Sequence, residues 1–318
     1  MRTFLEFEKP VADVFGKIEE LRAIGKESAV DGADEIAKLE DKAEKALAEI
    51  YAKLTPWQKT EVARHPDRPH ASHYINALVE DFSPLAGDRA FREDAAIIAG
   101  VGRFGGRSVA VMGTERGADT ESRLKHNFGM ARPEGYRKAR RIMELAERFR
   151  LPVITLIDTS GAYPGIGAEE RGQAEAIARS TEQALQLTVP TIAVIIGEGG
   201  SGGAIALATS NKVFMLEHAI YSVISPEGAA TILWRDSTRA QEAAASMRIT
   251  AQDLMKLGVI DGIVDEPLGG AHRAPGVAVD AVRNIVLGAL EELSGQEPAA
   301  LKQTRAERFL AIGRTLEV

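Results

Sequence analysis

The chain has 318 residues, of which 45% are hydrophobic and 27% are charged. This length and hydrophobic content support one large globular domain or two smaller ones, and they exclude a disordered chain. A formal net charge of −7 argues against a nucleic-acid binder, and the absence of cysteine excludes disulfides, thiolate metal sites and a cysteine nucleophile.

No run of about 18 uncharged apolar residues occurs in the sequence, so no transmembrane helix is predicted. The opening segment from Met1 to Lys9 lacks the basic and then apolar layout of an export signal. We therefore expect a soluble, cytoplasmic protein that binds neither a membrane nor a nucleic acid.

In chain order, apolar residues first recur every three or four positions, from Val11 to Leu21 and from Ile36 to Leu54. This period predicts two amphipathic helices joined by a turn near Ser28 to Gly32. The apolar stripe of such a hairpin must be buried, and we expect it to pack against the main body of the protein rather than against another subunit.

From Asp81 onward, β-rich runs alternate with amphipathic segments, which predicts an α/β core. Phe104-Gly105-Gly106 separates two of these runs and is typical of a β-hairpin. The expected strands are 95–103, 108–113, 153–157, 191–196, 213–216, 220–224 and 259–264. The expected helices are 133–150, 168–187, two that begin near 227 and 251, 277–293 and 298–312. We expect three regions: an N-terminal helical region (1–80), the α/β core (81–270) and C-terminal helices (271–318).

Two glycine-rich turns each follow a predicted buried strand and precede a predicted helix. They are Asp158 to Gly165 (DTSGAYPG) and Gly197 to Ala204 (GEGGSGGA). Ligands of α/β proteins bind at such positions, because glycine lets backbone N–H groups face a ligand and the following helix adds its positive end. The alternative interpretation is that both segments are simply tight, closely packed turns. The occurrence of two such turns at matching positions argues against this alternative.

Three chemistries could use the second turn. A phosphate-binding P-loop needs Lys and then Ser or Thr after its last glycine, whereas Ala204 and Ile205 follow Gly203 here. A serine hydrolase would use Ser201 of the G-x-S-x-G pattern as its nucleophile; its partners would be Asp261 or Asp265 with His272. An oxyanion hole would instead use the N–H groups of Gly202 and Gly203.

Other polar residues have a functional and a structural interpretation. Asp158, Glu198 and Glu227 could orient catalytic groups, but such residues are more often helix caps or turn residues. A basic stretch could meet the phosphates of a ligand or an acidic partner domain, or it could be a solvated helix face. It comprises Arg123, Lys125, His126, Arg132, Arg137, Lys138, Arg140 and Arg141.

Several segments resemble the α subunits of acetyl-coenzyme A carboxylase carboxyltransferases, in that family's order and spacing. The resemblance covers nearly the whole chain. It differs at Ser160, where the family usually has proline, which removes some rigidity from the first turn. The segments are 4–10, 63–66, 127–130, 133–139, 158–165, 167–173, 197–204, 221–228 (YSVISPEG) and 267–273 (PLGGAHR).

The resemblance implies a crotonase-like fold, a spiral of ββα units with an N-terminal helical hairpin and C-terminal helices. It implies transfer of a carboxyl group from carboxybiotin, held by a separate biotin carboxyl carrier protein, to acetyl-CoA, giving malonyl-CoA for fatty acid biosynthesis. The nearest alternative is carboxyl transfer to another acyl-CoA. The resemblance further implies an α2β2 heterotetramer whose β subunit carries a four-cysteine zinc module, and a biotin carboxylase component that uses ATP. No metal is expected in this chain.

By the same resemblance, the backbone amides of Gly202 and Gly203 form an oxyanion hole on the biotin side. No side-chain base is then required, because the biotin nitrogen can take the α-proton of acetyl-CoA. We expect the surrounding substrate contacts to come from Gly199, Gly200, Ser201, Gly161, Ala162 and Tyr163.

Overall fold

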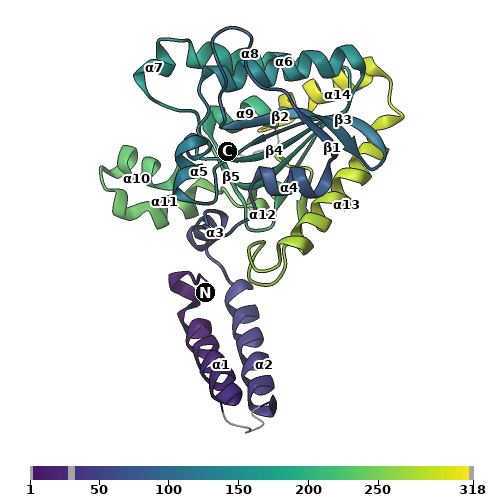
Figure 1. Cartoon of the computed structure of the whole chain (residues 1–318). Coiled ribbons are helices and arrows are strands. Elements are labelled where there is room, and N and C mark those ends of the chain that lie inside the picture. The colour runs from purple at the N-terminus through teal and green to yellow at the C-terminus, as the bar shows by residue number, and fades with distance from the viewer. Residues whose placement is uncertain (1–2, 28–32, 315–318) are drawn as a thin grey trace.

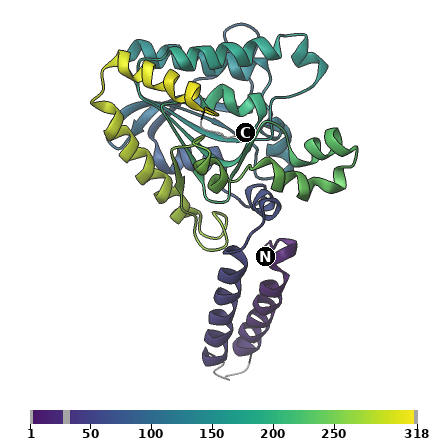
Figure 2. The same cartoon turned by 180° about the vertical axis from the view of Figure 1, so that it is seen from behind.

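The computed structural model describes residues 3–27 and 33–314. A helical hairpin projects from a body in which helices cover both faces of one twisted sheet (Figure 1). The 180° view in Figure 2 shows the same separation of hairpin and body. No helix among the described residues combines the length and the apolar character needed to cross a bilayer.

The hairpin consists of a 3₁₀ turn, η1 (Glu6–Glu8), and two helices, α1 (Lys9–Glu27) and α2 (Ala33–Tyr51). Both helices were predicted, whereas the predicted turn near residues 28–32 lies outside the described residues. The apolar stripes pack mainly against each other, around Val11, Ala43 and Leu47. The expectation that the stripe packs against the main body is therefore wrong, because the described part of the hairpin contacts the body only at its base (Figure 1).

The sheet has eight strands in the order β1-β2-β3-β4-β5-β6-β8, with β7 paired to the end of β5. The pairs β1–β2 and β2–β3 are antiparallel, and all later pairs are parallel. The strands are β1 (Glu80–Pro84), β2 (Ile97–Phe104), β3 (Arg107–Thr114), β4 (Val153–Thr159), β5 (Thr191–Gly200), β6 (Lys212–Leu216), β7 (Ile220–Ser222) and β8 (Gly262–Val264).

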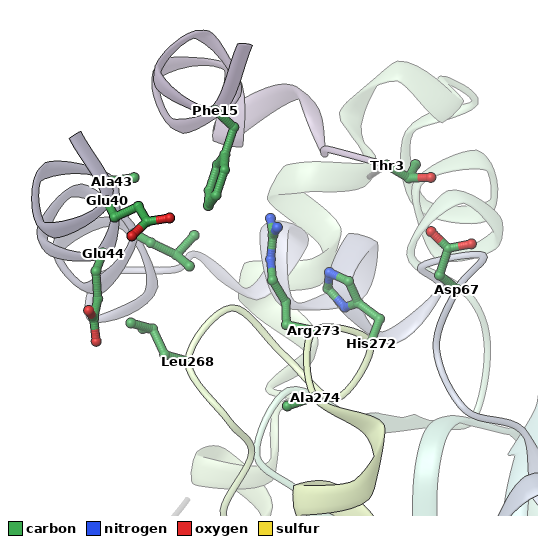
Figure 3. Close-up of a pocket in the computed structure, with 11 residues that line it drawn as sticks. Thr3, Phe15, Glu40, Ala43, Glu44, Asp67, Leu268, His272, Arg273 and Ala274 are labelled. Atoms are coloured by element: carbon green, nitrogen blue, oxygen red, sulfur yellow. The ribbon is translucent and has the colours of Figure 1, made fainter. Parts of the chain in front are cut away.

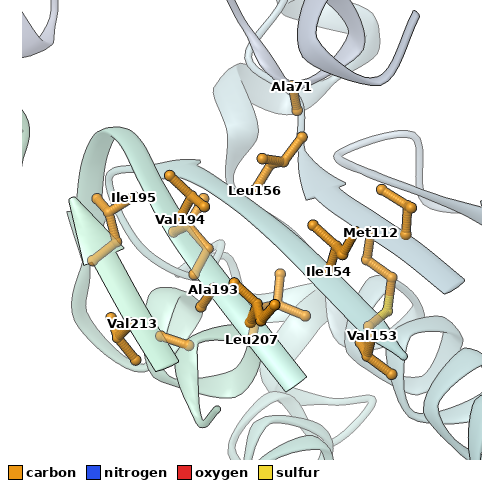
Figure 4. Close-up of a cluster of buried hydrophobic side chains, with 14 of the residues drawn as sticks. Ala71, Met112, Val153, Ile154, Leu156, Ala193, Val194, Ile195, Leu207 and Val213 are labelled. Atoms are coloured by element: carbon orange, nitrogen blue, oxygen red, sulfur yellow. The ribbon is translucent and has the colours of Figure 1, made fainter. Parts of the chain in front are cut away.

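Every residue of β4 and β5 is buried, as expected for the central strands of a parallel sheet that is covered on both faces. Figure 4 shows Ile154 and Leu156 of β4 beside Val194 of β5, in the apolar core. This packing holds the two strands rigidly and fixes the positions of the turns that follow them.

Helices α6, α8 and α9 cover one face of the sheet, with α14 beside α8, while α4 and α13 cover the other face (Figure 1). The remaining helices lie around the carboxyl ends of the parallel strands and along the sheet edge. Their bounds are α3 (Pro56–Ala63), α4 (Ala71–Leu78), α5 (Thr120–Lys125), η2 (Asn127–Gly129), α6 (Pro133–Phe149), α7 (Ile166–Glu169), α8 (Gln173–Gln186), α9 (Ser201–Ala208), α10 (Pro226–Trp234), η3 (Ser237–Arg239), α11 (Ala240–Met247), α12 (Ala251–Lys256), α13 (Pro275–Ser294) and α14 (Pro298–Ala311).

The predicted helix over 168–187 is interrupted, which corrects the sequence-based expectation. Gly172 has φ 78° and precedes the first residue of α8, so the segment forms two helices instead of one. The predicted β-hairpin at Gly105 and Gly106 is confirmed, because both glycines have the positive φ that a two-residue hairpin turn requires.

Candidate active site

The two glycine-rich turns lie side by side because β4 and β5 are parallel neighbours. Thr159 near the end of β4 pairs with Gly199 near the end of β5. The first turn then leads to α7, and the second leads directly into α9 at Ser201. The edge formed by the carboxyl ends of parallel strands is where α/β folds place ligands.

Direct backbone contact between the turns explains the glycines. A Cβ atom added to Gly200 would lie 2.3 Å from Ser160 O, and one added to Gly203 would lie 2.8 Å from Ala162 N. Gly161 has φ 142°, a conformation that a side chain disfavours. The structure thus brings together all the predicted turn residues from Gly161 to Tyr163 and from Gly199 to Gly203.

The amides at the start of α9 have no hydrogen-bond acceptor among the described residues. The first N–H groups of any helix lack an intrahelical acceptor, and no turn or side-chain acceptor within the described residues binds those of Gly202 and Gly203. Gly202 is half-buried and Gly203 is buried. The positive end of the helix dipole adds to the attraction of these amides for a negative oxygen.

Ser201 has the backbone of a nucleophile elbow but not its partners. Its φ of 55° places it at a sharp turn between strand and helix. Asp261, however, donates its N–H to Val213 O. Val213 pairs with Ala193 of β5, so Asp261 lies level with Ala193. The chain from Ala193 to Ser201 spans roughly 26 Å when extended, which separates Asp261 from Ser201.

The other predicted triad partners also lie elsewhere. Asp265 is exposed beyond the end of β8. His272 stacks on His65 with ring centroids 3.7 Å apart and lines a cavity of about 460 Å³ beside the hairpin (Figure 3). Burial and the neighbouring His65 lower the pKa of His272 to about 3. The structure therefore assembles no triad from these residues.

The first turn is anchored to the segment before α6. Tyr163 N–H donates to Ala131 O (3.0 Å), and Gln173 Nε2 donates to Ala131 O and Tyr163 O (both 2.9 Å). The guanidinium of Arg132 lies over the Tyr163 ring, 4.6 Å from its centroid. These contacts hold the half-buried Tyr163 ring at the rim of the turn.

A buried ionic network lies beneath both turns. Asp158 accepts hydrogen bonds from the Glu198 amide (3.0 Å), from Arg116 (3.2 Å) and from His70 Nδ1 (3.2 Å). Glu198 in turn binds Arg116 at 3.2 Å and Arg64 at 2.6 Å. Because these contacts join the end of β4 to the end of β5, they fix one turn relative to the other.

Charge pairing determines the protonation state of this network. Burial alone would raise the pKa of Asp158, but Arg116 and His70 outweigh it and lower the pKa to about 2. Glu198 raises the pKa of the Arg64 guanidinium further above its usual range, despite burial. Asp158 is therefore ionised at neutral pH and serves as a fixed acceptor.

A family model described as "Acetyl co-enzyme A carboxylase carboxyltransferase-like" matches residues 4–313. The chain belongs to this family. It is 65% identical over 317 residues to the acetyl-coenzyme A carboxylase carboxyl transferase subunit alpha of Methylobacterium nodulans (strain LMG 21967 / CNCM I-2342 / ORS 2060), covering 99% of this chain and 100% of the relative.

Two solved structures share the fold of this carboxyltransferase-like chain. One is transcarboxylase 12S with methylmalonyl-coenzyme A and methylmalonic acid bound (TM-score 0.60, 20% identity, 72% of this chain and 42% of that chain). The other is the β subunit of P. aeruginosa geranyl-CoA carboxylase (TM-score 0.57, 17% identity, 78% of this chain and 46% of that chain). The chain spans less than half the length of either neighbour. The predicted crotonase-like fold is confirmed.

Sequence reasoning missed the partners of the acidic residues. Asp158 and Glu198 are buried members of ion pairs and cap no helix, and Glu227 binds Arg64 at 2.7 Å. Arg64 lies in one of the segments that resemble the family, so the sequence marked it as a candidate. No sequence pattern marked Arg116 or His70, because burial beside a carboxylate depends on the fold.

Two residues of the basic stretch make structural contacts. Arg137 binds Asp88 at 2.7 Å, and Lys138 binds Glu93 and the carbonyl of Asp94. These residues therefore hold α6 to the preceding loop. In the part of the chain that the structure describes, no group of three or more His, Asp or Glu side chains could hold a metal ion.

Proposed function

We propose that this chain is the α subunit of an acetyl-CoA carboxylase carboxyltransferase, which transfers a carboxyl group from carboxybiotin to acetyl-CoA and forms malonyl-CoA. The observation that carries this proposal concerns the N–H groups of Gly202 and Gly203 at the start of α9, which bind no acceptor among the described residues, in a chain of this family. The name of the Methylobacterium relative agrees with it.

In this proposal the two amides act as an oxyanion hole. Carboxybiotin, delivered by a carrier protein, is the substrate that brings the carboxyl group on a ureido nitrogen, and the neighbouring ureido oxygen becomes more negative on transfer. Preorganised N–H donors stabilise such charge, each contributing about 2.7–4 kcal/mol. The half-buried Gly202 would present its amide to this group, while Gly203 packs closely against the first turn.

The remaining predicted contacts complete the substrate wall. Gly161, Ala162 and Tyr163 would face the substrate from the first turn, and Gly199, Gly200 and Ser201 from the second. Their support is the direct contact between the two turns and the anchoring of Tyr163 by Arg132.

We further propose a β partner in an α2β2 heterotetramer, together with the biotin carboxyl carrier protein and an ATP-dependent biotin carboxylase, in the cytoplasm. The zinc module would belong to the β subunit. The subunit named in the Methylobacterium relative supports a β partner for this chain.

Reconstitution tests the proposal. The purified chain and its β partner should together exchange the carboxyl group between malonyl-CoA and a biotin derivative, and the chain alone should be inactive. Comparing kcat/KM for malonyl-CoA and methylmalonyl-CoA determines the acyl specificity. A folded complex without exchange of either substrate would refute carboxyl transfer.

Ser201→Ala separates carboxyl transfer from serine hydrolysis. The variant should retain most of the exchange activity, because Ser201 has no assembled triad. Complete loss of an ester-hydrolase activity of the chain on the same substitution would instead support a nucleophilic role.

A further inference from the structure

A second large cavity, of about 610 Å³, lies on the face of the sheet that α8, α9 and α14 cover, and we call it the C-terminal cavity. Helix α14, yellow in Figure 2, lies beside α8 on this face. The walls are predominantly apolar and include Leu185, Ile205, Leu257, Phe309 and Ile312. None of the contacts proposed above for carboxyl transfer comes from this cavity.

Three of the four hydroxyl groups that line the C-terminal cavity are paired with backbone, and the fourth belongs to Tyr221. Thr181 donates to Ile177 O at 3.1 Å, and Thr209 donates to Ile205 O at 2.9 Å. Ser222 donates to Ile224 O at 2.8 Å. These hydroxyl hydrogens are not free for water or a polar ligand, and apolar cavities of this kind stay dry or take apolar guests.

Two arginine side chains accompany this apolar lining. Arg308 binds Asp261 at 2.9 Å and the carbonyl of Val259, but its Nη1 is buried and has no hydrogen-bond partner in the described part of the chain. Arg248 also lines the cavity, is exposed, and forms no ion pair with any described carboxylate. An occupant that combines an apolar body with one negative group would satisfy both features.

We propose that the C-terminal cavity binds an amphipathic anion, an unbranched acyl chain that ends in a carboxylate. The volume lies within the range of about 300–1,000 Å³ that ligand sites occupy. The acyl chain would lie along Ile205 and Phe309, and the carboxylate would pair with the exposed Arg248. The inference rests on the cavity alone and does not depend on the proposed carboxyl transfer.

Calorimetric titration of the full chain with hexanoate, octanoate, decanoate and dodecanoate tests this inference. We expect one site per chain and an affinity that increases about fourfold with each added CH₂ until the cavity is full. Decan-1-ol, which lacks the charge, should bind at least about tenfold more weakly than decanoate. An affinity independent of chain length would overturn the proposal.

Two arginines provide a matched comparison. Arg248→Glu should weaken decanoate binding at least about tenfold, because it places a negative charge at the cavity. Arg235→Glu is the control, since Arg235 is exposed, has the same left-handed conformation after a neighbouring helix, and does not line the cavity. Equal effects of the two substitutions would mean binding through general charge and would overturn the site.

Thr181→Phe, at a half-buried wall position, should weaken decanoate binding by narrowing the cavity while leaving the thermal midpoint near that of the parent chain. If this variant does not fold, the Arg248 and Arg235 pair decides the question. Repeating the decanoate titration in the presence of saturating β partner distinguishes an acyl ligand from the β subunit as the occupant of the cavity. Binding that persists supports an acyl ligand, whereas binding that disappears would identify the cavity as part of the subunit interface and overturn the proposal.

Discussion

Gly203 illustrates how one missing side chain determines the geometry of the candidate site. A Cβ atom there would lie 2.8 Å from the Ala162 amide nitrogen and 2.9 Å from Tyr136 Oη, whereas one on Gly202 would meet only Ile177, at 3.4 Å. Substitution is therefore expected to disturb the structure more at Gly203 than at Gly202, although nothing in the sequence distinguishes the two glycines.

We expect Gly203→Ala to lower the kcat of carboxyl exchange by about 100-fold to 1,000-fold, the effect of losing one oxyanion donor. The substitution would push the two turns apart and misalign the amides. Gly202→Ala is the matched control and should change kcat less than about tenfold. Comparable rates for Gly203→Ala and the parent complex, both folded, would exclude these amides from the reaction.

Asp158 makes a pH-dependent contribution to stability. Its pKa is lowered from 3.8 to about 2, so its pairing stabilises the fold above about pH 4 and is lost as the pH falls towards 2. The magnitude is roughly 2 kcal/mol. Between pH 4.5 and 2, the free energy of unfolding measured with urea should fall by roughly 2 kcal/mol more for the parent chain than for Asp158→Asn. Asp280→Asn, at the surface, should follow the parent, and parallel curves for Asp158→Asn would contradict the assignment.

At the scale of elements, α14 is anchored by one buried arginine. Arg305 is fully buried and donates to the carbonyls of Ala184, Leu187 and Val189 at 2.6–3.0 Å, and to two side chains at the start of β5 and before β6. Burial lowers its pKa to about 10, well above neutral pH. This one side chain therefore ties the C-terminal helix to the loop that precedes β5.

Replacement of Arg305 by Met should lower the free energy of unfolding by at least about 3 kcal/mol, because several buried acceptors would lose their donor. Urea denaturation of the full chain measures this change. Lys302→Met, on an exposed position of the same helix, should change stability by less than about 0.5 kcal/mol. A similar stability for both variants would mean that the acceptors find other donors.

Element boundaries also show where local patterns are sufficient. The Pro133 helix start and the glycine hairpin before β3 depend on neighbours in the sequence and were predicted. The break between α7 and α8 and the short helices α3 and α4 were not, because a local period cannot show where a helix must stop to pack.

For the whole molecule, the attachment of the hairpin depends on a buried carboxylate. Glu8 accepts hydrogen bonds from Tyr51 Oη (2.9 Å) and from Arg273 (2.7 Å), and Arg273 lies over the Phe4 ring. The pair joins the first turn of the chain to the segment before α13. Figure 3 shows Arg273 between this segment and the hairpin helices.

We expect Glu8→Leu to loosen the hairpin while leaving the sheet intact, because Arg273 and Tyr51 would lose their buried acceptor. Breaking such a pair costs about 3–5 kcal/mol, so hydrogen exchange in α1 and α2 should accelerate at least about 100-fold. Exchange in β4 and β5 should stay unchanged. Glu6→Gln, at an exposed ion pair, is the control; equal acceleration in both variants would show that the hairpin is held by other contacts.

The α/β class, most strands and helices, and the paired glycine turns could be inferred from residue order, because periodicity and turn chemistry act over a few neighbouring positions. The family could be inferred as well, since its motifs are local. The pairing of Asp158 with Arg116, the separation of Ser201 from Asp261 and the projecting hairpin required the folded chain. Each depends on residues distant in sequence, whose contacts exist only after β4 and β5 pair and the helices close over them.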